Sequence, residues 1–221
     1  QPQHAQVLIN RSNLLLRLQR HARAMRDLEL VLRLRPSMPE AHNNLGRLFM
    51  HLGQLDKAVE SFQKSIKIKP NYEYAHNNLG LAYNDLGNWE EAAKCYKRAM
   101  TINPSYFEPC ANYANLLTDL NDFDEALRIY ERANELKPEA DYMQGNILYT
   151  KMRICVWDNY SNQLIDLQSK INDGKKVIGP FQLIALIDDP EIQSKVSIIY
   201  AQDKYPQNNF LPKMDHYPKH K

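Results

Sequence analysis

Apolar and polar residues recur along this chain with a helical spacing, and the whole pattern repeats every 34 residues. The stretch AHNNLG at 41–46 returns letter for letter at 75–80. One place of the repeat is always proline, with no insertion between the units: Pro36, Pro70, Pro104 and Pro138. A fixed period of this length is typical of proteins that use one supersecondary unit several times.

Small and large side chains occupy fixed places within the unit, counted from Ala5. The eighth place is small and the twentieth is always alanine: Ser12, Gly46, Gly80, Ala114 and Ala24, Ala58, Ala92, Ala126. The seventeenth, twenty-fourth and thirtieth places are mostly large and apolar, as in Trp89, Tyr96 and Ile102 of the third unit. Small residues opposite large ones let two helices interlock, so each unit is predicted to be an antiparallel helix pair.

A tight turn is expected between the two helices of each unit, and a proline stop after the second. Gly53, Gly87 and Asn121 mark these turns, because Gly and Asn tolerate a positive φ beyond a helix end. Proline lacks the amide hydrogen that a continuing helix needs. The helices of the repeats are expected at 5–18, 21–34, 39–52, 55–68, 73–86, 89–102, 107–120 and 123–136.

With these features the chain resembles the tetratricopeptide repeat (TPR) family, whose period is 34 residues and whose signature is a Leu-Gly, Ala, aromatic, Ala, Pro pattern. The resemblance implies an all-α fold, a right-handed α-solenoid of antiparallel helix pairs with a concave inner wall and a helical C-terminal cap. We expect the TPR array to span residues 1–140. Its repeats should lie at about 5–38, 39–72, 73–106 and 107–140.

Beyond the fourth repeat the pattern decays. We expect residues 141–205 to form a partial fifth repeat and a helical cap or junction, and residues 206–221 to form an extended linker. Helical spacing continues over 158–172. Two shorter helices should follow, the second with Asp189 as its cap and Pro190 in its first turn.

Asparagine occupies the sixth place of every unit and continues the 34-residue step once beyond the last proline. These residues are the candidate peptide-binding site: Asn10, Asn44, Asn78, Asn112 and Asn146. The sixth place shares a helical stripe with the second, ninth and thirteenth, which in such repeats faces the concave side. An asparagine amide offers a donor and an acceptor, so a column of them can bind the backbone of an extended peptide. The alternative is structural, because the same amides can bond neighbouring helices to each other.

No catalytic, cofactor or metal motif is found in the sequence. GxSxG, HExxH, GxGxxG and phosphate-binding glycine loops are absent, so this chain alone is not expected to be an enzyme or to hold a cofactor. His42 and His76 lie one repeat apart without a carboxylate or thiol to complete a tetrahedral metal site, so core or interhelix positions are favoured. Cys110 holds the equivalent place in the fourth unit and is predicted to be a buried thiol.

Charge and cysteine content restrict the partners and the compartment. Residues 1–36 contain seven Arg against only Asp27 and Glu29, but these Arg are spread over all faces of the predicted helices. A solvated surface is therefore favoured over a nucleic-acid site. No apolar run approaches the ~20 residues that a membrane helix needs. Three cysteines without CxxC spacing indicate reduced thiols, so we expect a cytoplasmic protein with no membrane partner.

Three C-terminal segments carry a second resemblance. KMRICVWDNY at 151–160, GPFQLIALIDDPEIQ at 179–193 and the closing HYPKHK are similar to the segment that joins repeats to catalytic domain in O-linked N-acetylglucosamine transferases and their SPINDLY relatives. That resemblance implies that the asparagine column holds protein substrates and that the sugar-nucleotide domain lies outside these residues. We therefore expect the part of a protein O-glycosyltransferase that recruits polypeptides.

Two alternatives remain open. The chain can be a stand-alone TPR adaptor or co-chaperone, or an oligomerisation scaffold, for which a homodimer is the simplest form. A clamp for acidic tails would need Lys and Arg along the groove, whereas the predicted groove is mainly Asn with other polar groups. The other polar members of the stripe are Arg47, His51, Asp85, Asn115 and Asp119.

Overall fold

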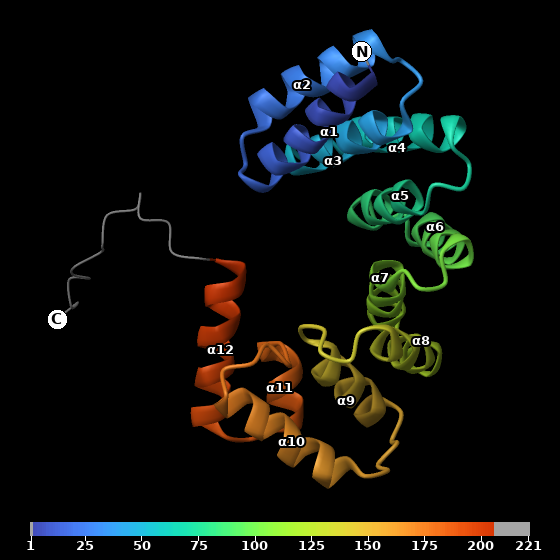
Figure 1. Cartoon of the computed structure of the whole chain (residues 1–221). Helices are drawn as coiled ribbons and strands as arrows, with labels where there is room; N and C mark the ends of the chain where they lie inside the picture. Colours follow the sequence, from blue (N-terminus) through green and yellow to red (C-terminus); the bar gives the residue numbers. More distant parts are fainter. Residues whose placement is uncertain (1, 206–221) are drawn as a thin grey trace, which may run out of the picture. The chain divides into compact units, whose positions relative to one another are not determined.

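The computed structural model describes residues 2–205, and every regular element in that range is an α-helix (Figure 1). The chain divides into two compact units, Gln1–Lys137 and Pro138–Lys221. The expected linker at 206–221 lies outside the described residues. The first unit consists of α1 (Pro2–Arg17), α2 (His21–Leu34), α3 (Pro39–His51), α4 (Leu55–Ile68), α5 (Glu73–Asp85), α6 (Trp89–Ile102), α7 (Phe107–Asp119) and α8 (Phe123–Leu136).

Apart from α1, which begins at Pro2 rather than at residue 5, the helix bounds agree with the sequence predictions to within two residues, because the signals that end these helices are local. Gly53, Gly87 and Asn121 have φ values of 69°, 75° and 62°, as the predicted turns require. In the first repeat the same turn is made by Gln19, with φ 54°. That residue was not predicted, because a side chain other than Gly or Asn seldom adopts this conformation.

The two helices of a repeat interlock where a small residue faces a large ring. A Cβ atom added to Gly46 would lie 2.5 Å from the Phe62 ring, and one added to Gly80 would lie 2.6 Å from the Tyr96 ring. The aromatic place is fully buried in these repeats, as predicted. The other two apolar places are only partly buried, since Trp89 is 52% exposed. They cover the pair at its edges rather than fill its centre.

Each repeat stacks on the next mainly through its second helix, which packs against the first helix of the following repeat, and the first helices add a further contact. Helices α1, α3, α5 and α7 pack against one another in succession, whereas consecutive second helices α2, α4, α6 and α8 do not within the part of the chain that the structure describes. Figure 1 shows the odd-numbered helices α3, α5 and α7 following one another along one side. An array that is closer on one side than the other must curve toward the close side, so the odd-numbered helices form the concave wall.

The second unit contains α9 (Met143–Arg153), α10 (Tyr160–Asn172), α11 (Pro180–Leu186) and α12 (Pro190–Lys204). Its core gathers Leu148, Leu167, Ile171, Ile178, Leu183, Ile187 and Val196. Gly145 lets the segment before α11 run against α9, because an added Cβ atom would meet Ile178 at 2.4 Å. As predicted, the Asp189 carboxylate caps α12 by accepting hydrogen bonds from the Glu191 and Ile192 amides.

Candidate functional site

Three members of the asparagine column lie on successive helices of the concave wall. Asn44 is on α3, Asn78 on α5 and Asn112 on α7. Each side-chain nitrogen donates to the preceding first helix. The Asn78 Nδ2 lies 2.9 Å from Asn43 Oδ1, and the Asn112 Nδ2 lies 3.0 Å from Asn77 Oδ1. These bonds tie neighbouring repeats together.

The bond of Asn44 is longer because the first repeat has no asparagine at the fifth place. Its Nδ2 lies 3.5 Å from the Ser12 hydroxyl, and the Asn44 side chain is buried. In the later repeats the receiving residues Asn43 and Asn77 are themselves only 5% and 4% exposed. A buried amide needs partners, so the two adjacent asparagines in AHNNLG satisfy each other across the repeat boundary.

One polar atom of each later amide is not used by the fold. The Oδ1 atoms of Asn78 and Asn112 accept no hydrogen bond from another described residue. Both side chains are half-buried rather than enclosed. An asparagine oxygen has two acceptor sites, so each of these atoms can accept a hydrogen bond from a backbone N–H of a bound chain.

The two ends of the predicted column differ from its centre. Asn10 on α1 is exposed, and its Oδ1 already accepts from Gln6 Nε2 at 3.3 Å. Asn146 lies on α9, in the second unit. Its backbone carbonyl accepts from the Thr150 hydroxyl at 2.7 Å. The structure therefore brings Asn44, Asn78 and Asn112 together on packed helices of one unit.

A tyrosine cluster borders the column on the same wall. The Tyr74 ring lies edge-on to both Tyr72 and Tyr106, with centroid distances of 5.6 and 5.2 Å. Tyr72 is buried, and desolvation raises its pKa to about 12. Tyr74 is 47% exposed, so it offers a ring face to solvent. Rigid aromatic side chains of this kind supply much of the binding energy at protein interfaces.

Arg47 lies beside this cluster and beside the column. Burial lowers the pKa of its guanidinium, and the Tyr72 and Tyr106 hydroxyls are near enough to oppose that shift. Its Nη1 donates to Asn13 Oδ1 at 3.0 Å. Among the other polar residues of the predicted stripe, Asn115 accepts a hydrogen bond through its Oδ1 from the Tyr130 hydroxyl at 2.6 Å. This bond connects the two helices of the fourth repeat. Burial raises the pKa of the Asp119 carboxyl.

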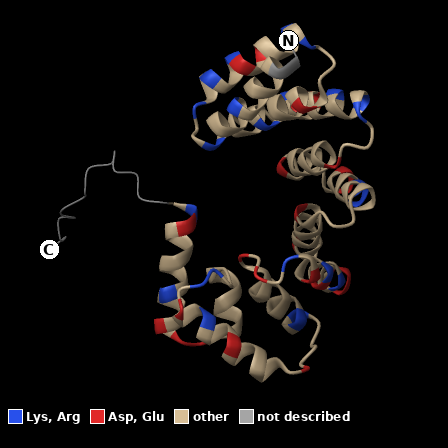
Figure 2. Cartoon of the chain, viewed as in Figure 1, with Lys and Arg blue, Asp and Glu red and all other residues tan. Residues whose placement is uncertain are grey.

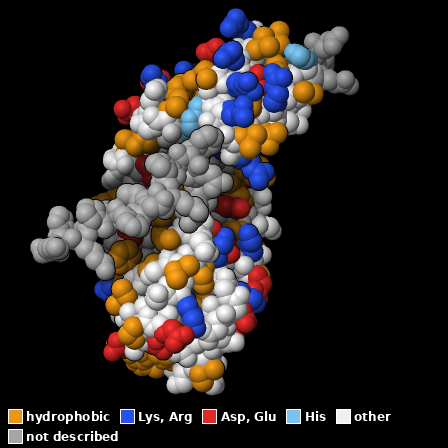
Figure 3. Space-filling view, turned by 90° about the vertical axis from the view of Figure 1, so that its left-hand side faces the viewer, with side chains coloured by type: hydrophobic (Ala, Val, Ile, Leu, Met, Phe, Trp, Pro, Cys, Tyr) orange, Lys and Arg blue, Asp and Glu red, His pale blue; other side chains and the backbone are white. Residues whose placement is uncertain are grey.

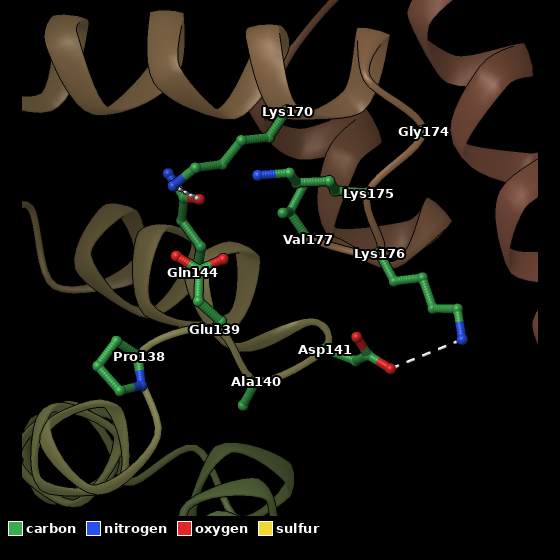
Figure 4. Close-up of a pocket in the computed structure, with 10 residues that line it drawn as sticks. All are labelled: Pro138, Glu139, Ala140, Asp141, Gln144, Lys170, Gly174, Lys175, Lys176 and Val177. Carbon is green, nitrogen blue, oxygen red and sulfur yellow. Dashed lines mark hydrogen bonds and ion pairs between the residues drawn. The ribbon is translucent and has the colours of Figure 1, made fainter.

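A separate hollow of about 290 Å³ lies in the second unit (Figure 4). Lys170, Lys175 and Lys176 line it, opposite Gln144 and Asp141. Two of the lysines are neutralised inside the unit. Lys170 pairs with Asp166 at 2.7 Å, and Lys176 pairs with Asp203 and, at 3.6 Å, with Asp141. The Lys170 pair lies within α10, whereas Lys176 connects Asp141, just before α9, to Asp203 on α12, so the lysines of this hollow have a stabilising role.

The two histidines and the cysteine considered in the sequence analysis have structural roles within the repeats. The His42 and His76 rings bond the carbonyls of Pro36 and Pro70 at 2.8 and 2.9 Å, six residues back in each repeat. Cys110 is buried, as predicted. Among the described residues, no three His, Cys, Asp or Glu side chains are grouped so that they could hold a metal ion. No described helix combines the length and the apolarity that crossing a membrane requires.

The fold and this wall define a helical-repeat protein of the α-solenoid class. Sequence profiles described as TPR repeat match residues 46–87, and profiles described as tetratricopeptide repeat match 73–106, 5–38 and 107–139. Together they cover more than half of the chain, which therefore belongs to the TPR family. No curated protein sequence matches the chain significantly.

Solved structures with a similar fold include other TPR proteins. A thermophilic TPR protein from Thermus thermophilus superposes with a TM-score of 0.63 at 19% identity, covering 89% of this chain and 98% of that one. MamA from Desulfovibrio magneticus gives 0.63 at 18% identity, with 75% and 94% coverage. Another MamA structure gives 0.62 at 20% identity, with 73% and 96% coverage. At these identities the likeness shows the all-α TPR fold.

Sequence reasoning missed the residues that complete the site. The fifth-place partners Asn43 and Asn77 stand next to the predicted column in the repeated letters NN, and that doubling was the available signal. The tyrosine cluster had no such signal. Tyr72 and Tyr106 precede helices α5 and α7, while Tyr74 lies inside α5. Their meeting depends on how consecutive repeats stack.

Proposed function

We propose that this TPR array is a binding module that holds extended polypeptides on its concave wall. The observation that carries the proposal is the pair of Oδ1 acceptors on Asn78 and Asn112, left without a partner in the described fold beside an exposed Tyr74 ring. Backbone N–H groups of a peptide would donate to these acceptors. The tyrosines would supply apolar contact area, and recognition would tolerate many peptide sequences.

In each of these amides the Nδ2 donor bonds to the preceding repeat while the Oδ1 acceptor is free in the described fold, so substitutions can test the two atoms separately. Replacing Asn78 and Asn112 together by Ala removes donor and acceptor. Replacing both by Asp keeps an acceptor oxygen but removes the donor to the preceding repeat. We expect both double variants to lose stability, and only the Ala variant to lose affinity for several unrelated neutral peptides in calorimetric titrations.

The comparison is made below the unfolding midpoint of the weaker variant, so that both proteins are folded. If the Ala and Asp variants lose affinity equally, and in proportion to their loss of stability, the asparagine column only stabilises the superhelix. Unchanged affinity in both would remove the wall from the binding site. Binding by Asp but not by Ala supports the acceptor role directly.

The proposal extends to the parent activity. The segments at 151–160 and 179–193 support a role as the substrate-recruiting part of a protein O-glycosyltransferase, and they fall on the end of α9 and on α11 with the start of α12. We expect the native protein, isolated by an antibody to this array, to transfer a sugar from a nucleotide sugar to Ser or Thr of proteins. The 221-residue chain should neither bind nor hydrolyse the nucleotide sugar. Turnover by this chain alone would contradict the assignment.

A stand-alone adaptor is the second candidate. The observation that favours it is that this chain covers 94–98% of the Desulfovibrio and Thermus TPR chains of similar fold. A native protein that recruits peptides, shows no transferase activity and has the mass of the repeat array alone would decide for the adaptor.

A further inference from the structure

A second hollow, of about 420 Å³, lies at the first end of the TPR array. It is lined by Leu16, Arg17, Gln19, His21, Arg47 and His51. Three elements converge here: the end of α1, the start of α2 and the end of α3. The positive φ of Gln19 makes the tight turn that brings the start of α2 back against α1. Figure 2 shows Lys and Arg positions along these first helices, and the space-filling view of Figure 3 shows Lys, Arg and His side chains gathered over them.

Neither arginine of this hollow has a counterion among residues 2–205, which the structure describes. Arg17 has no carboxylate partner among the described residues, and Arg47 donates only to the neutral Asn13 amide. The nearest acid on α2, Asp27, is taken by Arg11 through two hydrogen bonds of 2.6 and 2.7 Å. In the hollow of the second unit, by contrast, lysines pair with aspartates. A partly buried guanidinium without a counterion favours an anionic ligand.

Two histidines complete the lining. The His21 and His51 rings stack with centroids 5.7 Å apart and planes 21° from parallel. The His21 Nε2 atom is buried and has no hydrogen-bond partner. Burial, followed by the charges of His21 and Arg47, lowers the pKa of His51, so the fold disfavours the protonated form of this ring. An anion bound in this hollow would favour the protonated form of His51 and could pair with the free His21 nitrogen.

We propose that this hollow binds one anionic side chain of the polypeptide held on the concave wall, through Arg17, Arg47 and the His21–His51 pair. The inference rests on the proposed function and names a ligand chemistry for it. Arg47 is part of both the hollow and the concave wall. It donates to Asn13 in the first repeat and lies near Tyr72 and Tyr106, which belong to the second and third repeats. A carboxylate and a phosphate ester share the required chemistry.

The proposal predicts that acidic peptides bind more tightly as pH falls. The titratable groups facing the hollow are His21 from α2 and His51 from α3, beside the permanent cations Arg17 from α1 and Arg47 from α3. Tyr72 and Tyr106 from the following repeats stay neutral because their pKa values are raised. A glutamate peptide keeps its charge between pH 8 and 5.5, and its carboxylate would favour the protonated form of His51, which burial disfavours in the free protein. Tightening by about three- to tenfold is expected.

The experiment uses the full 221-residue chain and three peptides that differ at one central position: Gln, Glu or phosphoserine. Affinities are measured at pH 8 and 5.5. The test variant is Arg17→Gln with His51→Gln, both exposed positions, and the matched control is Arg23→Gln with Arg26→Gln, which removes exposed charge on α2 outside the hollow. The Glu peptide should bind more tightly than the Gln peptide to the wild type and to the control variant. The test variant should bind the two peptides with equal affinity. Comparing the affinities of the phosphoserine and Glu peptides at pH 8 shows whether a phosphate ester or a carboxylate binds more tightly.

Failure of the two proposals can be told apart. If none of the three peptides binds, the polypeptide-binding function fails. If all bind equally at both pH values, or if the control loses the acidic preference as the test variant does, the anion site is overturned. Inorganic phosphate provides a peptide-free readout, because it should shift the ring NMR signals of His21 and His51 in the wild type. Absence of that shift also overturns the site.

Discussion

At the residue scale, the asparagine column shows one side chain serving two partners. The sequence left open whether these amides bind a ligand or hold the superhelix. In the structure the nitrogen of Asn78 is bonded to Asn43 across the repeat boundary, while its oxygen has no partner in the described fold. The structural role therefore belongs to the donor, and the proposed binding role belongs to the acceptor.

The Asn43–Asn78 bond can be measured by a double-mutant cycle. Replacing either residue by Ala leaves the other with an unpaired polar group near the boundary between repeats, at a cost of about 1 to 3 kcal/mol. Replacing both should cost less than the sum, and the coupling should be about 0.5 to 1.5 kcal/mol. Urea unfolding of the four proteins gives this coupling. Strictly additive losses would mean that the bond contributes nothing.

Ala92 tests the small-residue rule at the centre of a repeat. The residue is fully buried on α6, in the twentieth place that is alanine in every unit. Replacement by Trp should overpack the helix pair and lower the free energy of unfolding by at least about 1 to 3 kcal/mol. Thermal unfolding measures the loss, with Glu90→Trp on the exposed face of the same helix as control. An unchanged melting temperature for the Ala92 variant would contradict the interlocking of small and large residues.

At the element scale, the helices begin and end through different signals in the two units. In the repeats a proline, glycine or asparagine near the boundary is sufficient, and no side-chain cap accepts a bond from the first turn of α2 to α8. The last helix, α12, has a side-chain cap at Asp189 followed by Pro190. Interhelix packing stabilises the repeat helices, whereas α12 buries only Val196 completely and depends more on its cap.

Removal of that cap should loosen α12 specifically. Asp189→Ala deletes the acceptor for two amides of the first turn, at 2.9 and 3.2 Å, and should cost about 1 kcal/mol. The neighbouring Asp188→Ala removes the same charge without removing a cap bond. Hydrogen exchange of the α12 amides should be faster in the first variant and unchanged in the second. Equal exchange in both would show that the cap is not limiting.

At the scale of the whole molecule, each of the two units is stabilised internally by a different kind of interaction. The first depends on repeated apolar contacts, and the second combines an apolar core with a charged network at Asp203. The Asp203 carboxylate pairs with Lys176 and accepts the Tyr142 hydroxyl at 2.9 Å, so its pKa is lowered to about 2. The causes, largest first, are the hydrogen bonds from Lys176, Tyr142 and Lys204.

The sign of the resulting pH dependence follows from this depressed pKa. The unfolded chain takes up the Asp203 proton near pH 4, but the folded unit takes it up only near pH 2, so the stabilisation is present above pH 4 and is lost between pH 4 and 2. Trp157 reports on the second unit once Trp89 in the first is replaced by Phe. We expect Asp203→Asn to be less stable at pH 5 and to show less change over this acid range. An unchanged acid transition would contradict the network's role.

The sequence by itself determined the repeats, the all-α class, the bounds of eight helices and three of their turns. These features depend on local chemistry: helical spacing, proline stops and residues that tolerate positive φ. It also predicted the asparagine column, because a polar residue on a 34-residue step is visible without coordinates. It missed the turn at Gln19, whose left-handed φ has no compositional signal.

Only the tertiary structure decided what each column residue touches. The Asn78–Asn43 bond, the meeting of Tyr74 with Tyr106 and the stacking of His21 on His51 join residues that are 30 to 35 positions apart or lie in different repeats. Such contacts depend on the offset between packed helices, which many sequences can adjust through small changes in packing. The periodic pattern therefore specifies the unit, and the stacking of units specifies the surface on which a ligand can bind.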